Sequence, residues 1–175
     1  MEKEKLNIKD KIKIFVKCLD KRKKSSFIHT LRAAEHSNIA AIEAVAVYCN
    51  TASSRELNCF AAIGIAFGIW PDGHSDKAGN MGETMKRLSS DMETFENIFR
   101  RMLKCKEYEE LLEFIPIIVR AAKQKNITIN YELLLEDLWY WSEKNHNISA
   151  ERWAKSFWGN KERSEENVLV ENNNQ

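Results

Sequence analysis

The chain has 175 residues, of which 43% are hydrophobic and 30% are charged, and its formal net charge is +1. This length suits one domain or two small lobes with a core of their own, so neither a cofactor nor a disulfide is needed for stability. A net charge near zero does not by itself indicate a nucleic-acid partner. Because only 6 Gly and 2 Pro occur among many lysines and glutamates, the composition predicts an all-α helical bundle.

The first residues predict a basic amphipathic helix. An apolar stripe recurs at helical spacing, with lysines on another face: Ile8, Ile12, Phe15 and Leu19. Such a helix could lie on a membrane, but the stripe is ordinary for docking onto the rest of a domain, so no membrane partner is expected. Segment 1–13 is too charged for a secretory signal, and we expect a cytoplasmic protein.

The rest of the amino-terminal lobe, predicted to span 1–70, is also helical. Further helices are expected over 27–35, 38–48 and 55–69, with Ser53 or Ser54 as the N-cap of the last. The longest apolar stretch, 60–70, is too short to span a bilayer, which takes about 20 residues. Gly64 and Gly68 share one face of the last helix and predict close packing there.

Segment 71–80, PDGHSDKAGN, is the only long stretch with loop composition, and we expect it to separate the two lobes. The carboxy-terminal lobe is predicted to span 81–160, followed by a frayed tail over 161–175. Successive helices are expected over 81–90, 93–105, 108–125, 131–145 and 149–158. Pro116 is predicted to kink the third of these, because proline removes a backbone donor.

Four of the five tryptophans lie between Trp139 and Trp158. Apolar positions follow helical spacing in both segments that hold them: Leu134, Leu138 and Trp141 in one, and Trp153 with Phe157 in the other. The tryptophans on these stripes are expected in the core, although one could instead stack on a nucleic-acid base. Asp137 is placed to orient a neighbouring tryptophan or arginine.

Sequence signals for catalysis are weak. The four cysteines match no spacing typical of zinc or redox sites, and they are interpreted as reduced thiols. His74 and Asp76 share the loop, but two ligands without a third do not make a metal site. Phosphate-binding glycine fingerprints are absent. No metal or cofactor is expected, and a hydrolase centred on His74 and Asp76 is a minor alternative.

Basic residues recur in successive helices of the second half. They are Lys86 and Arg87, then Arg100, Arg101 and Lys104, then Arg120 and Lys123, with Lys77 in the loop ahead of them. Aligned on one face, they would form a groove for a phosphate backbone. The alternative is that they are ordinary surface charges paired with glutamates.

Several short motifs follow one another between about residue 80 and residue 158. It comprises Gly82 to Leu88, Phe99-Arg100-Arg101-Met102-Leu103, 109–119, 127–131, Leu134 with Asp137-Leu138 and Trp141, and Arg152-Trp153-Ala154 with Phe157-Trp158. This ordered set resembles the CasB family, the small subunit of the type I-E CRISPR Cascade complex. Upstream, the resemblance is looser and rests on Leu31-Arg32-Ala33, on Arg55 and on Lys77.

The resemblance implies an all-α protein of two helical lobes without catalytic activity. It also implies that two copies lie side by side in the complex, together with other Cascade subunits, guide RNA, and target and non-target DNA. In this family, basic residues contact nucleic-acid backbone without sequence specificity and stabilise the R-loop by holding the displaced strand.

Carried over by position, the implied phosphate contacts are Arg32, Arg55, Lys77, Lys86, Arg87, Arg100, Arg101, Arg120 and Lys144, to which the basic pattern adds Lys104 and Lys123. Two departures from the family pattern are Asn97-Ile98 ahead of Phe99, and Pro116 where arginine is common. The alternative function is a helical protein–protein interaction module that uses the Gly64 and Gly68 face or the aromatic end, with incidental surface charge.

Overall fold

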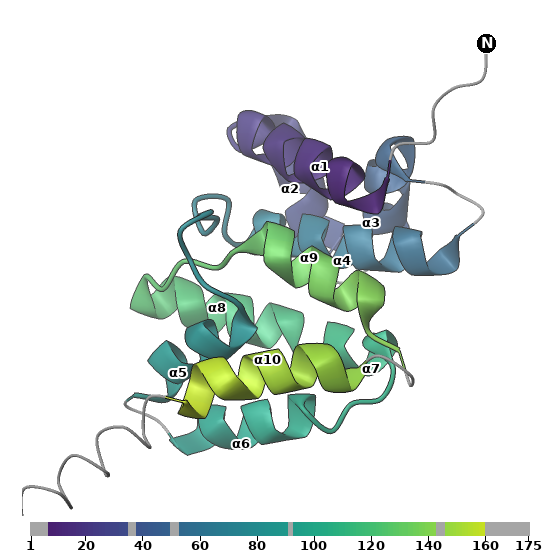
Figure 1. Cartoon of the computed structure of the whole chain (residues 1–175). Helices are drawn as coiled ribbons and strands as arrows, with labels where there is room; N and C mark the ends of the chain where they lie inside the picture. The colour runs from purple at the N-terminus through teal and green to yellow at the C-terminus, as the bar shows by residue number, and fades with distance from the viewer. Residues whose placement is uncertain (1–6, 35–37, 50–52, 91–92, 143–145, 160–175) are drawn as a thin grey trace, which may run out of the picture.

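A computed structural model describes residues 7–34, 38–49, 53–90, 93–142 and 146–159. These residues form helices joined by loops, which confirms the all-α prediction (Figure 1). In chain order the elements are α1 (Ile8–Arg22), α2 (Ser26–Ala33), α3 (Asn38–Val45), the short 3₁₀ helix η2 (Ala46–Tyr48), α4 (Ser54–Ile69), α5 (Met81–Ser89), α6 (Glu93–Met102), α7 (Tyr108–Leu112), α8 (Ile115–Lys125), α9 (Tyr131–Tyr140) and α10 (His146–Trp158).

Polar side chains begin several of these helices. The Ser53 hydroxyl accepts the Glu56 backbone N–H at 3.2 Å, which confirms Ser53 as the N-cap of α4. Asn80 caps α5 in the same way, accepting the N–H of Gly82 at 2.9 Å. At the other end of α8, Asn126 adopts a left-handed conformation with φ of 53° and ends the helix.

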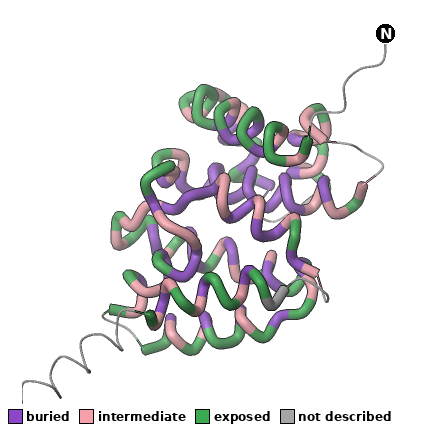
Figure 2. Tube along the Cα trace, viewed as in Figure 1, coloured by how far each residue is buried: buried purple, intermediate pink, exposed green. Residues whose placement is uncertain are grey.

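Helix α4 lies in the middle of the molecule, and its residues from 59 to 69 are buried. Helices α2 and α3 pack against it, as do α8 and α9, and Figure 2 shows the buried residues gathered between the helices. Helix α10 packs on α5, which in turn packs on α6. One continuous cluster of buried side chains joins both halves of the chain. No helix within the described ranges is both long and apolar enough to cross a membrane.

The predicted division into lobes at 71–80 stays a prediction. Helix α9 belongs to the second half of the sequence, yet it packs against α1 and α4 of the first half. Loop 71–80 lies against the start of α9, where Ile129 donates its backbone N–H to Gly73 and accepts one from Ser75. His74 and Ile129 form an isolated parallel bridge there.

Close packing at the two glycines of α4 is confirmed. A Cβ atom added at Gly68 would lie 2.5 Å from the backbone nitrogen of Arg32, and one at Gly64 would lie 3.1 Å from the Leu31 side chain. Helix α2 therefore covers this face of α4. The face proposed from sequence as a protein-binding surface is internal and is not available to a partner.

Pro116 does not kink a helix, and this expectation was wrong. Segment 108–125 forms two helices, α7 and α8, separated by Glu113 and Phe114. Pro116 lies in the first turn of α8, where its missing N–H costs nothing, because the first N–H groups of a helix have no partner within the helix. Pro116 is therefore accommodated at the start of α8 without distorting it.

Other helix ends differ from the predictions by a few residues. Helix α6 ends at Met102 instead of Cys105, and α10 begins at His146 instead of Ser149. Helix α9 ends at Tyr140, whereas residues 143–145 of its predicted span lie outside the described residues. The predicted tail over 161–175 also lies outside them.

The tryptophans on the two stripes are core residues, as predicted. Trp141 and Trp153 are both fully buried, with ring centroids 4.9 Å apart. Trp141 donates its indole N–H to the carbonyl of Cys105 at 3.0 Å. Trp139 and Trp158, which lie off the stripes, are half-buried.

Asp137 orients both a tryptophan and an arginine, which confirms the interpretation of its position. Its carboxylate accepts the indole N–H of Trp153 at 2.7 Å, the hydroxyl of Ser149 at 3.0 Å, and an N–H of Arg152. Burial raises the pKa of this carboxyl, and the three hydrogen bonds oppose that rise. The carboxylate thus joins α9 to α10.

Candidate nucleic-acid interface

Three of the predicted cations meet in one depression, although they come from helices far apart in the sequence. Arg32 of α2 lines it together with Arg120 and Lys123 of α8, and Ile69 and Gln124 complete the lining. All three cations are exposed. Among the described residues that line it, none is acidic. We call this depression the α2–α8 groove.

The carboxy-terminal end of α4 positions two of these cations. Arg32 donates its Nε–H to the carbonyl of Gly68 at 2.8 Å, and Lys123 donates from Nζ to the carbonyl of Ile69 at 3.1 Å. The last carbonyls of a helix carry partial negative charge and favour cations. A guanidinium has five N–H donors and an ammonium has three, so both side chains keep donors beyond those used here.

A second basic surface lies between α5 and α10. Lys86 and Arg87 of α5 line it with Lys155 of α10, and Glu83, Ser90 and Ser156 complete the lining. We call it the α5–α10 patch. Lys155 was not predicted from the sequence, and it forms an ion pair with Glu151 at 2.6 Å one turn earlier. No motif in the sequence singles it out, because its place beside Lys86 and Arg87 depends on the packing of α10 on α5.

Close contacts between α5 and α10 fix the geometry of this patch. A Cβ atom at Gly82 would lie 2.0 Å from the carbonyl oxygen of Trp153, so only glycine permits this approach. The Asn80 side chain donates to the Ser156 hydroxyl at 2.8 Å. The cations of the patch are therefore mounted on two helices in firm contact.

The end of α8 lies between the two basic surfaces. Lys123 contacts the end of α4, while Lys125 donates from Nζ to the carbonyl of Leu88 in α5 at 3.1 Å. Leu88 directly follows Arg87, which lines the α5–α10 patch. The last turn of α8 thus contacts both the end of α4 and the end of α5.

Arg101 and Lys104 lie in a depression of mixed charge. Glu110 and Glu113 line it with them, and the Arg101 guanidinium lies 5.4 Å from the centre of the Phe114 ring. Two carboxylates at this position repel phosphate, so the depression suits a polyanion less well than the α2–α8 groove does.

Arg100 is exposed and has two partners on the protein. Its guanidinium forms an ion pair with Glu96 at 2.6 Å and lies 5.1 Å from the centre of the Trp158 ring. Arg100 and Trp158 together present a cation and an aromatic surface on the α6 side of the molecule. Such a pair can contact both the phosphate and the base of a single strand.

Arg55 is half-buried and its contacts are with the protein itself. It donates to the carbonyls of Trp139 and Trp141 at the end of α9, and its guanidinium lies 4.2 Å from the centre of the Tyr108 ring. These contacts join α4 to α9 and α7. Lys77 is exposed in loop 71–80. Lys144 lies outside the described residues.

The loop contains a third group beside His74 and Asp76. The ligand atoms of His74, Asp76 and Glu132 all lie within 4.8 Å of one another, so the sequence-based view of only two potential ligands was incomplete. However, the Tyr131 N–H donates to His74 Nδ1 at 3.3 Å, and His74 Nε2 lies 2.9 Å from Asp76. A neutral ring that accepts at Nδ1 carries its proton on Nε2, which then has no lone pair for a metal. This arrangement suits fixing the loop to α9.

The buried cysteines have the properties of core residues. Burial raises the pKa of the Cys59 thiol to about 12 and that of Cys105 to about 11. Both thiols are therefore neutral near pH 7, whereas a nucleophilic cysteine needs its thiolate form.

The fold and these surfaces define an all-α protein with two basic surfaces, the α2–α8 groove and the α5–α10 patch. The model of the family described as CRISPR-associated protein Cse2 matches residues 15–158. The chain therefore belongs to the Cse2 family, also called CasB, whose members are structural subunits of the CRISPR Cascade complex.

A solved structure, the crystal structure of CasB from Thermobifida fusca, has the same fold. It is 14% identical in sequence, with a TM-score of 0.67 over 87% of this chain and 99% of that chain. No curated protein matches the sequence.

Proposed function

We propose that the protein is a non-catalytic small subunit of the type I-E Cascade complex that binds nucleic-acid backbone without sequence specificity. In this role it stabilises the R-loop by holding the displaced DNA strand. The observation that carries the proposal is the meeting of Arg32, Arg120 and Lys123 in the α2–α8 groove. All three were selected from the sequence as phosphate contacts, and they come from separate helices.

The chemistry of the groove supports backbone contacts in preference to base recognition. Its cations offer several N–H donors to phosphate oxygens, which every nucleotide presents alike. The α5–α10 patch offers further cations to a strand. Binding of this kind depends on local charge, so it is compatible with a net charge of only +1.

A few contacts to the displaced DNA strand supply enough free energy for the proposed role. R-loop formation exchanges a DNA duplex for a heteroduplex of similar stability, so a few contacts to the displaced strand shift the balance. Each contact releases condensed counterions, which makes the stabilisation sensitive to salt. The proposed partners are other Cascade subunits, a second copy of the chain, guide RNA, and target and non-target DNA in the cytoplasm.

Charge reversal in the groove tests the proposal. The variant Arg120→Glu with Lys123→Glu, assembled into the complex, should bind target DNA more weakly at all sequences. The slope of log affinity against log salt should fall by about 1.4 for two lost single-strand contacts. The matched control is Lys13→Glu with Lys17→Glu on the exposed face of α1. Equal R-loop stability and equal salt slopes for the groove variant and the wild type would contradict the proposal.

A further inference from the structure

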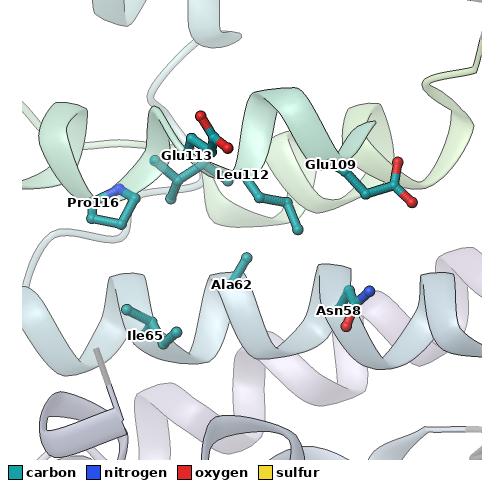
Figure 3. Close-up of a pocket in the computed structure, with 8 residues that line it drawn as sticks. Asn58, Ala62, Ile65, Glu109, Leu112, Glu113 and Pro116 are labelled. Atoms are coloured by element: carbon teal, nitrogen blue, oxygen red, sulfur yellow. The ribbon is translucent and has the colours of Figure 1, made fainter. Parts of the chain in front are cut away.

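An apolar cleft lies between α4 and the α7–α8 corner, and it shares no lining residue with the α2–α8 groove or the α5–α10 patch (Figure 3). Helix α4 contributes one face, and the opposite wall comes from α7 and the start of α8. The lining residues are Asn58, Ala62 and Ile65 on α4, with Glu109, Leu112, Glu113, Ile115 and Pro116 opposite. In Figure 3 the Leu112 side chain and the Pro116 ring point towards α4, with Ala62 facing them.

Tertiary contacts hold the two walls in place. The side chain of Asn58 donates to the Tyr108 hydroxyl at 3.4 Å, and Arg55 lies over the same tyrosine ring. Leu111 and Ile115 anchor α7 and the start of α8 in the core. The cleft is therefore preformed, and the small side chain of Ala62 leaves it open opposite Leu112. Burial of an aliphatic side chain in such a cleft is favourable.

Carboxylates at the mouth of the cleft determine which occupant fits. Glu109 and Glu113 are both exposed, and in Figure 3 the Glu113 carboxylate points away from α4 while the Glu109 side chain extends to the side. Glu113 also borders the depression that contains Arg101 and Lys104, so Glu109 marks the more acidic end. Negative charge here repels phosphate and attracts cations. A polypeptide with an aliphatic side chain beside lysine or arginine matches both the floor and the rim.

We propose that this cleft receives a segment of a different subunit of the Cascade complex, one that presents an aliphatic side chain flanked by lysine or arginine. Membership of the Cse2 family places the chain among other subunits. In this proposal, the glutamates between Glu107 and Glu113 repel nucleic acid from the surface that contacts protein. The proposal does not depend on nucleic-acid binding by the α2–α8 groove.

Two variants change the cleft without touching the groove. Ala62→Trp fills it, and Glu109→Lys with Glu113→Lys reverses its rim. Each should lower the apparent affinity of the chain for the remaining assembled subunits about tenfold or more, because a central interface contact is lost. The matched controls are Ala33→Trp at the exposed end of α2, and Glu43→Lys with Glu93→Lys on α3 and α6. Normal incorporation of correctly folded cleft variants would overturn the proposal.

Photo-crosslinking keeps the proposal testable even if Ala62→Trp unfolds the chain. Benzoylphenylalanine replaces Glu109 in the whole assembled complex, and mass spectrometry identifies the crosslinked peptide. Crosslinking to a different subunit, at a segment with an aliphatic residue adjacent to lysine or arginine, supports the proposal. Crosslinks confined to a second copy of this chain, to nucleic acid, or to a segment without cations would refute it. The salt dependence of R-loop binding tests the groove separately.

Discussion

Replacing Asp137 by asparagine removes one charge from the junction of α9 and α10 with almost no change of shape. The carboxylate is 1% exposed and accepts hydrogen bonds from Trp153, Ser149 and Arg152. An asparagine amide keeps one acceptor oxygen and turns an NH₂ group towards the remaining donors. At least one buried donor, either the Trp153 indole or the Ser149 hydroxyl, then loses its acceptor.

The loss in free energy of unfolding can be estimated from the hydrogen bonds that the Asp137 carboxylate no longer accepts. A hydrogen bond to a charged group contributes about 1.5–3 kcal/mol, and a buried donor without a partner adds to the loss. The ion pair with Arg152 contributes little more, because that side chain is 49% exposed. We expect Asp137→Asn to lower the free energy of unfolding by about 2–4 kcal/mol. In a domain of this size, the melting temperature should fall by roughly 4–16 °C.

Thermal and urea unfolding followed by circular dichroism measure this loss. The matched control is Glu136→Gln, one residue earlier, where the carboxylate pairs at 2.9 Å with Lys9, whose side chain is 60% exposed. That change should lower the free energy of unfolding far less, because exposed ion pairs contribute little to stability. A loss below about 1 kcal/mol for Asp137→Asn would refute the view that this carboxylate fastens α10 to α9.

Two further predictions concern the packing of α4. Gly68→Ala should lower the free energy of unfolding in urea by about 2 kcal/mol, because the new Cβ meets the Arg32 backbone at 2.5 Å. Gly64→Ala should lower the free energy of unfolding less, because its Cβ meets side chains, Leu31 at 3.1 Å and Val45 at 3.2 Å, and no backbone atom is among its nearest contacts. The reverse order would contradict this packing. The buried thiol of Cys59 should make the protein less stable at alkaline pH. Its pKa is 9.0 ordinarily and about 12 in the folded protein, so above pH 9 the unfolded chain loses the thiol proton first and is favoured. Between about pH 7 and pH 10, the free energy of unfolding of the wild type should fall by roughly 1.4 kcal/mol relative to that of Cys59→Ala. Parallel plots of unfolding free energy against pH for the two proteins would refute this prediction.

Local sequence patterns predicted most of the fold, because helix periodicity and caps depend on neighbours in the chain. The stripes that contain Trp141 and Trp153 and the cap at Ser53 are of this kind. The pattern failed at Pro116, where continuous apolar spacing hid the break between α7 and α8. It also did not predict that α9 packs on α1 and α4, since the packing partners of a helix depend on tertiary contacts.

The sequence predicted which basic residues belong to the candidate interface better than it predicted how they are arranged in space. The family resemblance selected Arg32 and Arg120, and the basic pattern along the helices added Lys123, but only the fold brings the three cations together. The resemblance also grouped Arg55 with them, although its guanidinium donates to carbonyls at the end of α9. A sequence gives the charge of an arginine, but the backbone carbonyls within its reach are set by tertiary structure.

Helix α4 relates the two proposed surfaces to each other. Its last carbonyls position Arg32 and Lys123 in the groove, while another part of its surface, at Ala62 and Ile65, forms the floor of the acidic-rimmed cleft. Because Gly68 lets α2 approach the same helix, displacement of α2 would move Arg32 and leave the cleft residues in place. A variant at Gly68 should therefore weaken contacts in the groove more than contacts in the cleft. The two surfaces share a scaffold and remain separable by mutation.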